Sequence, residues 1–235
     1  MTLDLSSLLR VFKLTLPVAT AYVPLGLALG VFMVSSGIDW YWAPISALVI
    51  FAGSIEFLVV TFIISGQPLI AVAWTALIVN FRHIFYGLSF PLKSMKSRLQ
   101  KAYGVFALTD ETYAIVCASK GRPLRGIDIS LLQVISHAWW VGASFLGAVL
   151  GSLLPAEVTG FEFALTAMFI ALAADAVSND SDMSLLTYAA ISCVFGALME
   201  FYILKSSFLG SGLICYLLLI SKDYKQAKME VPLHE

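Results

Sequence analysis

The chain has 235 residues, of which 60% are apolar and 12% are charged, and its mean hydropathy is +0.89. Soluble domains carry about 25% charged residues, so this composition excludes a water-soluble fold. The 14 Lys and Arg residues against 15 Asp and Glu residues leave a net charge of -1, which gives no basic field for a nucleic-acid partner. The composition predicts an all-α polytopic integral membrane protein surrounded by membrane lipids.

A helix that crosses a bilayer needs about 20 apolar residues. Eight hydrophobic segments follow one another along the chain: Leu14–Val34, Trp42–Ile64, Pro68–Leu92, Tyr103–Ser119, Ile129–Leu154, Phe163–Val177, Ser184–Leu204 and Ser206–Ser221. Several are short or interrupted by charged residues, so we expect about six to eight helical segments, some of them broken or re-entrant. No linker composition divides the chain, so a single membrane transport domain is expected over residues 1–235, with a basic tail from about residue 222.

The positive charges orient these segments, because short loops rich in Lys and Arg stay in the cytoplasm. Twelve of the 14 cations form four clusters: Arg10 and Lys13; Lys93, Lys96, Arg98 and Lys101; Lys120, Arg122 and Arg125; and Lys222, Lys225 and Lys228. Only one segment separates the second cluster from the third, so eight full crossings cannot keep all four clusters on one side. The conflict disappears if two segments before residue 120 turn back inside the membrane. We expect one to be Tyr103–Ser119, and the other to break at residues 52–54 or at residues 80–83; both termini are then cytoplasmic.

Irregular backbone at membrane depth needs protein or a water-filled cavity around it, so the breaks predict a polar site where they meet. Glu56 follows three small residues, Ala52-Gly53-Ser54, within one helical turn. It could pair with a substrate ammonium or with Arg82, or it could carry a proton. The alternative is a glutamate that only forms a salt bridge inside the helix bundle.

The second break is Asn80-Phe81-Arg82-His83. Asn80 tolerates the left-handed conformation that ends many helices, and the planar guanidinium of Arg82 suits a carboxylate. A helix break beside this guanidinium could hold the carboxylate of an amino acid. The alternative places Arg82 near the membrane surface, extended to the headgroups, with His83 at the interface.

The third break is Leu108-Thr109-Asp110-Glu111-Thr112. Thr109 or Asp110 suits the N-cap of a new half-helix, with Glu111 near its positive end. Neighbouring residues point about 100° apart on a helix, so the two carboxylates do not form a facing pair. We expect Asp110 rather than Glu111 to contact the transport pathway; a purely structural cap is the alternative.

Other ionisable residues allow two interpretations. Asp175 and Glu200 lie near segment ends, where an exposed position explains them as well as a proton relay does. His137 is either a pathway histidine or a hydrogen-bonded core histidine, with interfacial tryptophans at positions 139 and 140. Two small-residue motifs, Gly26-x-x-x-Gly30 and Gly147-x-x-x-Gly151, permit close helix contact or subunit docking.

Motifs of catalysis and of nucleotide binding are missing from the sequence. It has no G-x-S-x-G elbow, no His-Glu-x-x-His, no phosphate-binding glycine loop and no Cys/His cluster, so no cofactor, metal or enzymatic activity is expected. Its three cysteines, Cys117, Cys193 and Cys215, lack metal-ligand spacing. An intramembrane hydrolase using His83 and Asp110 is the remaining enzymatic alternative.

Three blocks, Phe51-Ala-Gly-Ser-Ile-Glu-Phe57, Val79-Asn-Phe-Arg-His-Ile-Phe-Tyr-Gly87 and Leu108-Thr-Asp-Glu-Thr-Tyr-Ala114, resemble the signature blocks of the AzlC family in order and spacing. The resemblance covers roughly residues 10–180. It implies the large subunit of a bacterial inner-membrane exporter of branched-chain amino acids, working with a small AzlD-type membrane subunit. Glu56 departs from the family, where glutamine is expected, and the added carboxylate can change substrate preference or coupling.

The chemistry of the residues fits the substrate that the resemblance implies. An apolar amino acid needs a cationic contact, an acceptor for its ammonium and an apolar pocket. The expected substrate-binding residues are Glu56, Phe57, Asn80, Arg82, Tyr86 and Asp110. Export against a gradient needs energy, and without a nucleotide motif a proton antiport is expected, with Glu56, His83, Asp110, Glu111 and Asp175 as candidate proton carriers. The alternative function is a non-transporting membrane scaffold or regulatory subunit of a transport complex.

Overall fold

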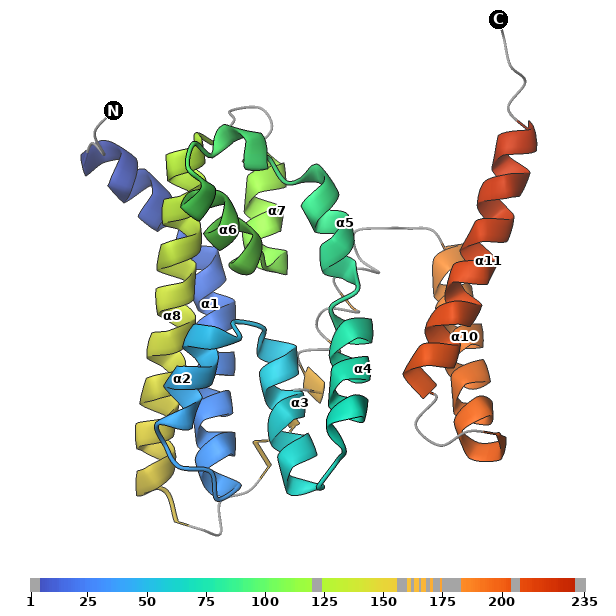
Figure 1. Ribbon diagram of the computed structural model, residues 1–235, viewed down its shortest axis with the longest axis horizontal. Helices are drawn as coiled ribbons and strands as arrows, with labels where there is room; N and C mark the ends of the chain where they lie inside the picture. Colours follow the sequence, from blue (N-terminus) through green and yellow to red (C-terminus); the bar gives the residue numbers. More distant parts are fainter. Residues whose placement is uncertain are drawn as a thin grey trace, which may run out of the picture. The chain divides into compact units, whose positions relative to one another are not determined.

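A computed structural model describes residues 5–119, 124–155, 160–161, 163–164, 166–167, 170, 174, 183–203 and 208–230. The chain forms two compact units, residues 1–168 and residues 169–235. All regular elements in the described ranges are helices, which confirms the all-α class (Figure 1). The expectation of one membrane domain over the whole chain stays a prediction.

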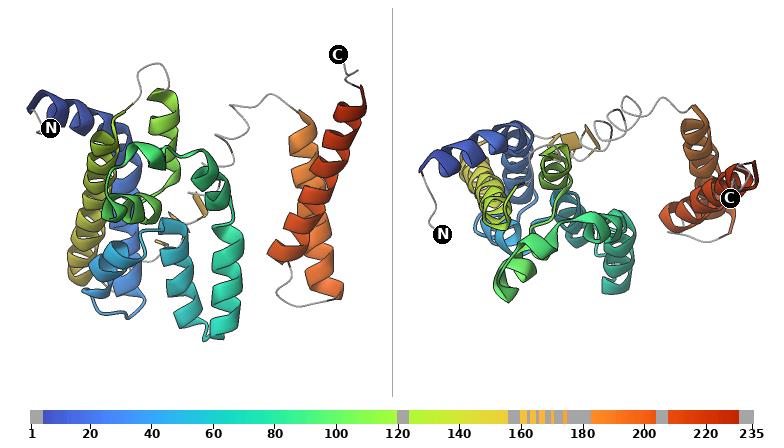
Figure 2. Two further views of the ribbon diagram at one scale, coloured as in Figure 1. Left: turned by 45° about the horizontal axis from the view of Figure 1, so that its top comes forward. Right: turned by 90° about the horizontal axis from the view of Figure 1, so that it is seen from above.

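Two long helices form the centre of the first unit. Helix α1 (Leu5–Ser35) and helix α8 (Gly126–Leu153) have 31 and 28 residues, enough to cross a bilayer at 1.5 Å per residue. They lie side by side and run in the same direction (Figures 1 and 2). Both glycine motifs lie in their contact, since a Cβ atom on Gly30 would overlap the backbone of Gly147 and Ala148, and one on Gly147 would overlap Leu27. The sequence expectation of close helix contact is confirmed.

Helices α2 (Trp42–Val49) and α3 (Gly53–Ile64) are too short to cross a bilayer and form a re-entrant hairpin. The ring of Trp40 contacts Phe145 near the C-terminal end of α8. The chain then rises along α8 until Ala47 reaches His137, reverses, and descends along α3 (Figure 1). We call residues 42–64 the outer hairpin. Phe51, at its tip, has a φ of 47°, a left-handed conformation that is strained for a residue with a bulky side chain.

Helices α4 (Leu69–Val79) and α5 (Arg82–Ser89) form one broken span with a bend of 45°. Asn80 ends α4 with a φ of -89°, so it does not adopt the left-handed conformation that asparagine tolerates. Phe81 also keeps right-handed helical angles, so the chain bends here and does not reverse. This break is the bend of a span.

A second re-entrant hairpin is made by α6 (Arg98–Phe106) and α7 (Asp110–Ala118), which follow a short 3-10 turn, η1 (Leu92–Ser94). We call residues 98–118 the inner hairpin. It enters from the end of the unit opposite to the outer hairpin (Figure 1). Its tip reaches Tyr22, near the middle of α1, through a hydrogen bond to Thr109.

The basic residues mark one end of the first unit. Arg10 Nη2 lies 3.0 Å from Asp128 Oδ2, Arg125 Nη2 lies 2.8 Å from Asp128 Oδ1, and Gly126 packs against the backbone of Ser94. The N-terminal cluster, the start of the Lys93–Lys101 loop and Arg125 therefore meet at this basic end. The two hairpins bring these clusters to one end because each returns the chain to the end from which it entered. Of the two breaks considered from the sequence, the one at residues 52–54 reverses the chain. Lys120 and Arg122 lie outside the described residues.

The second unit is a pair of helices, α10 (Met183–Tyr202) and α11 (Phe208–Glu230). Within α10, Ser184–Tyr202 is long and apolar enough to cross a membrane. Gly196 packs against Phe208 and Gly212, which lets the two helices approach closely. Glu200 Oε2 accepts a hydrogen bond from the backbone N–H of Phe208, 3.1 Å away, so it caps α11. Asp175 lies outside the described residues.

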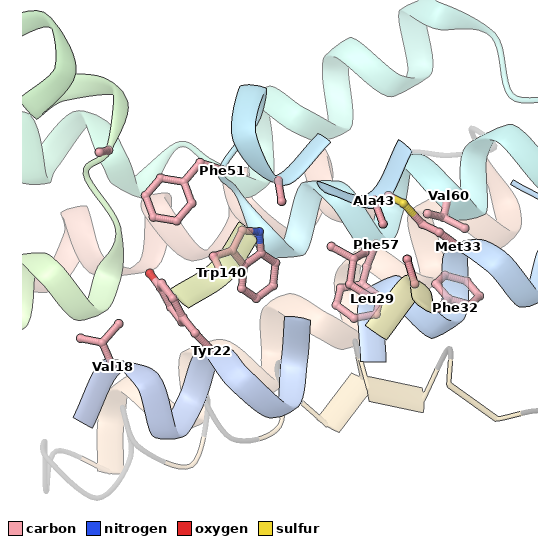
Figure 3. Close-up of a cluster of buried hydrophobic side chains, with 13 residues drawn as sticks. Val18, Tyr22, Leu29, Phe32, Met33, Ala43, Phe51, Phe57, Val60 and Trp140 are labelled. Carbon is pink, nitrogen blue, oxygen red and sulfur yellow. The ribbon is translucent and has the colours of Figure 1, made fainter. Parts of the chain in front are cut away.

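The core of the first unit fills the space between α1, α8 and the outer hairpin (Figure 3). One end of the core is aromatic: the rings of Tyr22 and Trp140, at the left of Figure 3, are 5.4 Å apart and edge to face. The other end holds Phe57, which is fully buried and stacks on Phe32 with centroids 6.0 Å apart. This packing fixes the depth at which the outer hairpin turns.

Candidate functional site

The tips of the two re-entrant hairpins meet halfway along α1 and α8. The ring of Phe51, from the outer tip, stacks on His137 with centroids 4.1 Å apart and lies 6.4 Å from Phe106 of the inner hairpin. Tyr22 and Trp140 close the same cluster (Figure 3). We call Tyr22, Phe51, Phe106, His137 and Trp140 the hairpin junction. The breaks at residues 52–54 and 108–112 therefore lie close together, and the polar site expected where they meet stays a prediction.

Glu56 is fully buried beside the junction. Its carboxylate accepts hydrogen bonds from Trp140 Nε1 at 2.9 Å, from Ser46 Oγ at 3.0 Å and from the backbone N–H of Ala52 at 3.2 Å. These donors come from α8, α2 and the hairpin turn, so Glu56 ties the outer hairpin to α8. The proposed pairing of Glu56 with Arg82 is not the one formed, because Arg82 reaches a different carboxylate.

His137 joins both hairpins to α8. Its Nε2 lies 3.1 Å from the carbonyl oxygen of Ala47, and its Nδ1 lies 3.0 Å from the hydroxyl of Tyr103. A carbonyl only accepts, so Nε2 carries the hydrogen and Nδ1 accepts from Tyr103. The Ala47 carbonyl belongs to the last turn of α2, where intrahelical partners are missing. Of the two interpretations of His137, this geometry fits the hydrogen-bonded core histidine.

The tryptophans beside His137 are not interfacial, as the core-histidine alternative had them. Trp140 is 3% exposed and donates to Glu56 at the centre of the unit. Trp139 donates to Thr15 Oγ1 over 3.4 Å, within the α1–α8 contact. Both indoles find polar partners away from the membrane surface, Trp140 in the outer hairpin and Trp139 on α1.

Arg82 and Asp110 form an ion pair across two helix N-termini. Arg82 begins α5 and Asp110 begins α7, and Arg82 Nη2 lies 2.8 Å from Asp110 Oδ2. Their side chains are 35% and 22% exposed. Arg82 Nε and Asp110 Oδ1 are buried and have no hydrogen-bond partner among the described residues. The pair therefore uses one of the two hydrogen bonds that a guanidinium and a carboxylate can share, and leaves one donor and one acceptor.

Glu111 turns away from Arg82 and contacts α1. Its Oε2 lies 2.9 Å from the hydroxyl of Tyr22, which also lies 2.8 Å from Thr109 Oγ1. The expectation that Asp110 and Glu111 do not face each other is confirmed. Thr109 is the N-cap of α7, and its Oγ1 accepts from the backbone N–H of Thr112, also as expected.

The other candidate residues lie around the start of α5 or in the core. His83 Nδ1 is 3.2 Å from the carbonyl oxygen of Asn80, and Tyr86 stacks on Tyr113 of α7 with centroids 4.4 Å apart. Phe57 lies in the hydrophobic core against Phe32. The structure thus brings Arg82 to Asp110 at the start of α7 and Tyr86 to Tyr113 of the same helix, and it places Phe57 and Glu56 in the outer hairpin.

Two polar residues of the site received no role from the sequence. Tyr22 lies in an apolar span, and the signal that could have found it is that a buried tyrosine hydroxyl needs a partner. Gln133 is fully buried, and its Nε2 donates to the carbonyl oxygens of Gly104 and Ala107 at 2.9 and 3.0 Å. It satisfies the end of α6 at the inner tip. Groups of three His, Cys, Asp or Glu that could hold a metal are not found in the described ranges.

Residues 17–154, more than half of the chain, match the family model described as AzlC protein. The chain belongs to the AzlC family. The matched range contains both hairpins, the junction and the Arg82–Asp110 pair.

Curated relatives agree with this membership. The branched-chain amino acid transport protein AzlC of Bacillus subtilis is 30% identical over 163 residues, which are 68% of this chain and 64% of that protein. An uncharacterized membrane protein of Helicobacter pylori is 30% identical over 68% of this chain and 72% of its own length. The inner membrane protein YgaZ of Escherichia coli is 29% identical over 67% and 68%. No solved structure matches the chain. The chain is a membrane protein, and its family supports a transport function.

Proposed function

We propose that this AzlC family member is a subunit of a secondary transporter that exports branched-chain or other small apolar amino acids across the bacterial inner membrane by proton antiport. The observation that carries the proposal is the half-used Arg82–Asp110 pair. The name of the Bacillus subtilis relative supports the substrate class.

The free groups of this pair match an amino acid. A zwitterion presents a carboxylate that accepts hydrogen bonds and an ammonium that donates them. Arg82 Nε is a free donor for the first, and Asp110 Oδ1 is a free acceptor for the second. Tyr86 follows Arg82 by one turn of α5, so both lie on the same face and the Tyr86 ring offers an apolar surface to the substrate side chain.

The proton is assigned to Glu111. Asp110 is already paired with Arg82, and Glu56 accepts three hydrogen bonds that hold the outer hairpin. Among the described residues, Glu111 is hydrogen-bonded by the neutral Tyr22 hydroxyl, and it stands next to the Arg82–Asp110 pair. Binding a proton at Glu111 and an amino acid at Asp110 within one helical turn provides the competition that antiport requires.

The basic end of the first unit is assigned to the cytoplasm, because Arg10, Arg125 and the turn η1 with Lys93 meet there. A small AzlD-type membrane subunit is the proposed partner. The sidedness test labels single cysteines with an impermeant maleimide in intact cells. Gly37→Cys should react and Lys96→Cys should not; the reverse pattern would invert the topology.

The transport test is counterflow of radiolabelled leucine, valine and methionine in proteoliposomes, with and without the small subunit. We expect saturable exchange that Arg82→Ala removes and that Arg98→Ala, a control at the start of α6, leaves intact. Arg82→Lys should also fail, because lysine keeps the charge but lacks Nε. Absence of exchange by the folded protein under both conditions would favour the scaffold alternative.

A further inference from the structure

We infer that Tyr22 is a positioning residue that couples the protonation of Glu111 to the Arg82–Asp110 pair. The inference rests on the proposed function, since it explains how the proton and the amino acid would affect each other.

The hydrogen bonds of Tyr22 have a direction. A phenol has one hydrogen, and an ionised carboxylate only accepts, so Tyr22 donates to Glu111 Oε2 at 2.9 Å. The Tyr22 oxygen then accepts from the hydroxyl of Thr109 at 2.8 Å. Thr109 is the N-cap of α7. One hydroxyl on α1 thus holds both the cap and the first turn of α7.

Tyr22 is itself held rigidly. It is 5% exposed, and its ring lies between Trp140 at 5.4 Å and Phe51 at 6.2 Å. Its helix packs against α8 through the glycine contacts at Gly26 and Gly30. By contrast, α7 has nine residues and forms one arm of a re-entrant hairpin. A change in the contact between them therefore moves α7 more readily than α1.

Protonation of Glu111 changes this contact. A hydrogen bond to a carboxylate is roughly twice as strong as one between neutral groups, so the neutral acid is held less firmly by Tyr22. Asp110 lies in the same turn and contacts Arg82 on α5. Loosening the first turn of α7 shifts Asp110 relative to Arg82, and this alters the amino-acid contact.

Other charged and titratable groups near Glu111 have separate partners. From its own helix, Asp110 pairs with Arg82 of α5. From α8, His137 bonds Ala47 and Tyr103. From the outer hairpin, Glu56 bonds Trp140. Within the described residues, Tyr22 is the group through which another helix contacts the Glu111 carboxylate.

The experiment compares Tyr22→Phe with the wild type in proteoliposomes that contain the small subunit. The variant keeps the ring packing and removes only the hydroxyl. We measure leucine counterflow at equal pH on both sides, and net leucine flux driven by an imposed pH gradient. Tyr22→Phe should retain counterflow, with a KM for leucine that differs from that of the wild type because the first turn of α7 is loosened at every pH, and it should lose the acceleration by the gradient.

Two further variants keep the test decisive. Tyr113→Phe removes another hydroxyl, bonded to Ser89 at 2.7 Å, from α7 itself, and it should keep the acceleration. Glu111→Gln should lose the acceleration by the pH gradient although Tyr22 is intact. This variant gives a second measurement if Tyr22→Phe does not fold. In the combined Tyr22→Phe, Glu111→Gln variant, the loss of acceleration should be no greater than in either single variant, because both changes remove the same contact.

The outcomes separate the two proposals. If the pH gradient does not accelerate wild-type flux, the antiport proposal fails. If the wild type responds and Tyr22→Phe responds equally, the coupling role of Tyr22 is wrong while antiport stands. A uniform loss of counterflow and of gradient-driven flux in Tyr22→Phe, with Glu111→Gln still accelerated, would also overturn it.

Discussion

Asp110 and Glu111 are neighbours in the first turn of α7, yet they contact different helices. Asp110 Oδ2 lies 2.8 Å from Arg82 of α5, and Glu111 Oε2 lies 2.9 Å from Tyr22 of α1. One helical turn thus connects the bend of a broken span with the central helix of the unit. Under the proposed function, the amino acid and the proton bind within this one turn.

The α1–α8 contact should tolerate no side chain at Gly147. Gly147→Val places atoms where the Leu27 backbone lies, so the two helices must separate. Overpacking of this kind costs about 1–3 kcal/mol or more. Thermal unfolding in detergent should show a lower Tm. Gly142→Ala, on the same helix with open space around it, is the control and should leave the Tm near that of the wild type; equal Tm values for both variants would contradict the packing seen here.

The stability of the outer hairpin should depend more on the hydrogen bonds that the Glu56 oxygens accept than on the charge of Glu56. Glu56→Leu leaves the buried N–H groups of Trp140 and Ala52 without their acceptor, at about 1–3 kcal/mol each. Glu56→Gln keeps one oxygen for Trp140, so it should lower the free energy of unfolding clearly less than Glu56→Leu does. Unfolding of both variants by heat, followed by circular dichroism, gives the order. A glutamine variant as unstable as the leucine variant would show that the charge itself holds the hairpin.

The basic end should be held together by Asp128. This carboxylate is fully buried and binds both Arg10 and Arg125. Asp128→Asn leaves two guanidinium groups close together with a neutral partner, and hydrogen bonds to charged groups contribute about 1.5–3 kcal/mol. We expect a lower Tm, and a smaller loss in Arg10→Gln, because Arg125 still pairs with Asp128. Asp39→Asn, which affects only the Tyr41 contact in the loop before α2, serves as the control.

Local chemistry made several features predictable. Hydropathy predicts the membrane class because charged residues are costly to bury in lipid, so long segments without charge mark the parts of the chain that enter the membrane. Thr109 was expected as a cap because a hydroxyl before a half-helix satisfies its first N–H groups, and the glycine motifs were expected in a helix contact because only small residues allow it. The basic clusters required two re-entrant segments. All of these follow from residues that are neighbours in sequence or share one helix face.

Other features needed the tertiary structure. The sequence alone left open whether residues 52–54 or residues 80–83 reverse the chain, because small residues and asparagine permit both a bend and a turn. It could not choose the carboxylate for Arg82, since charge is the same at Glu56 and Asp110 and only packing sets the distance. Tyr22 contacts Glu111 across 89 positions of sequence. The sequence by itself determined the membrane class, the breaks and the caps; the packing of α1 against α8 decided which broken ends meet, because side chains far apart in the chain become partners only when the backbones between them are fixed.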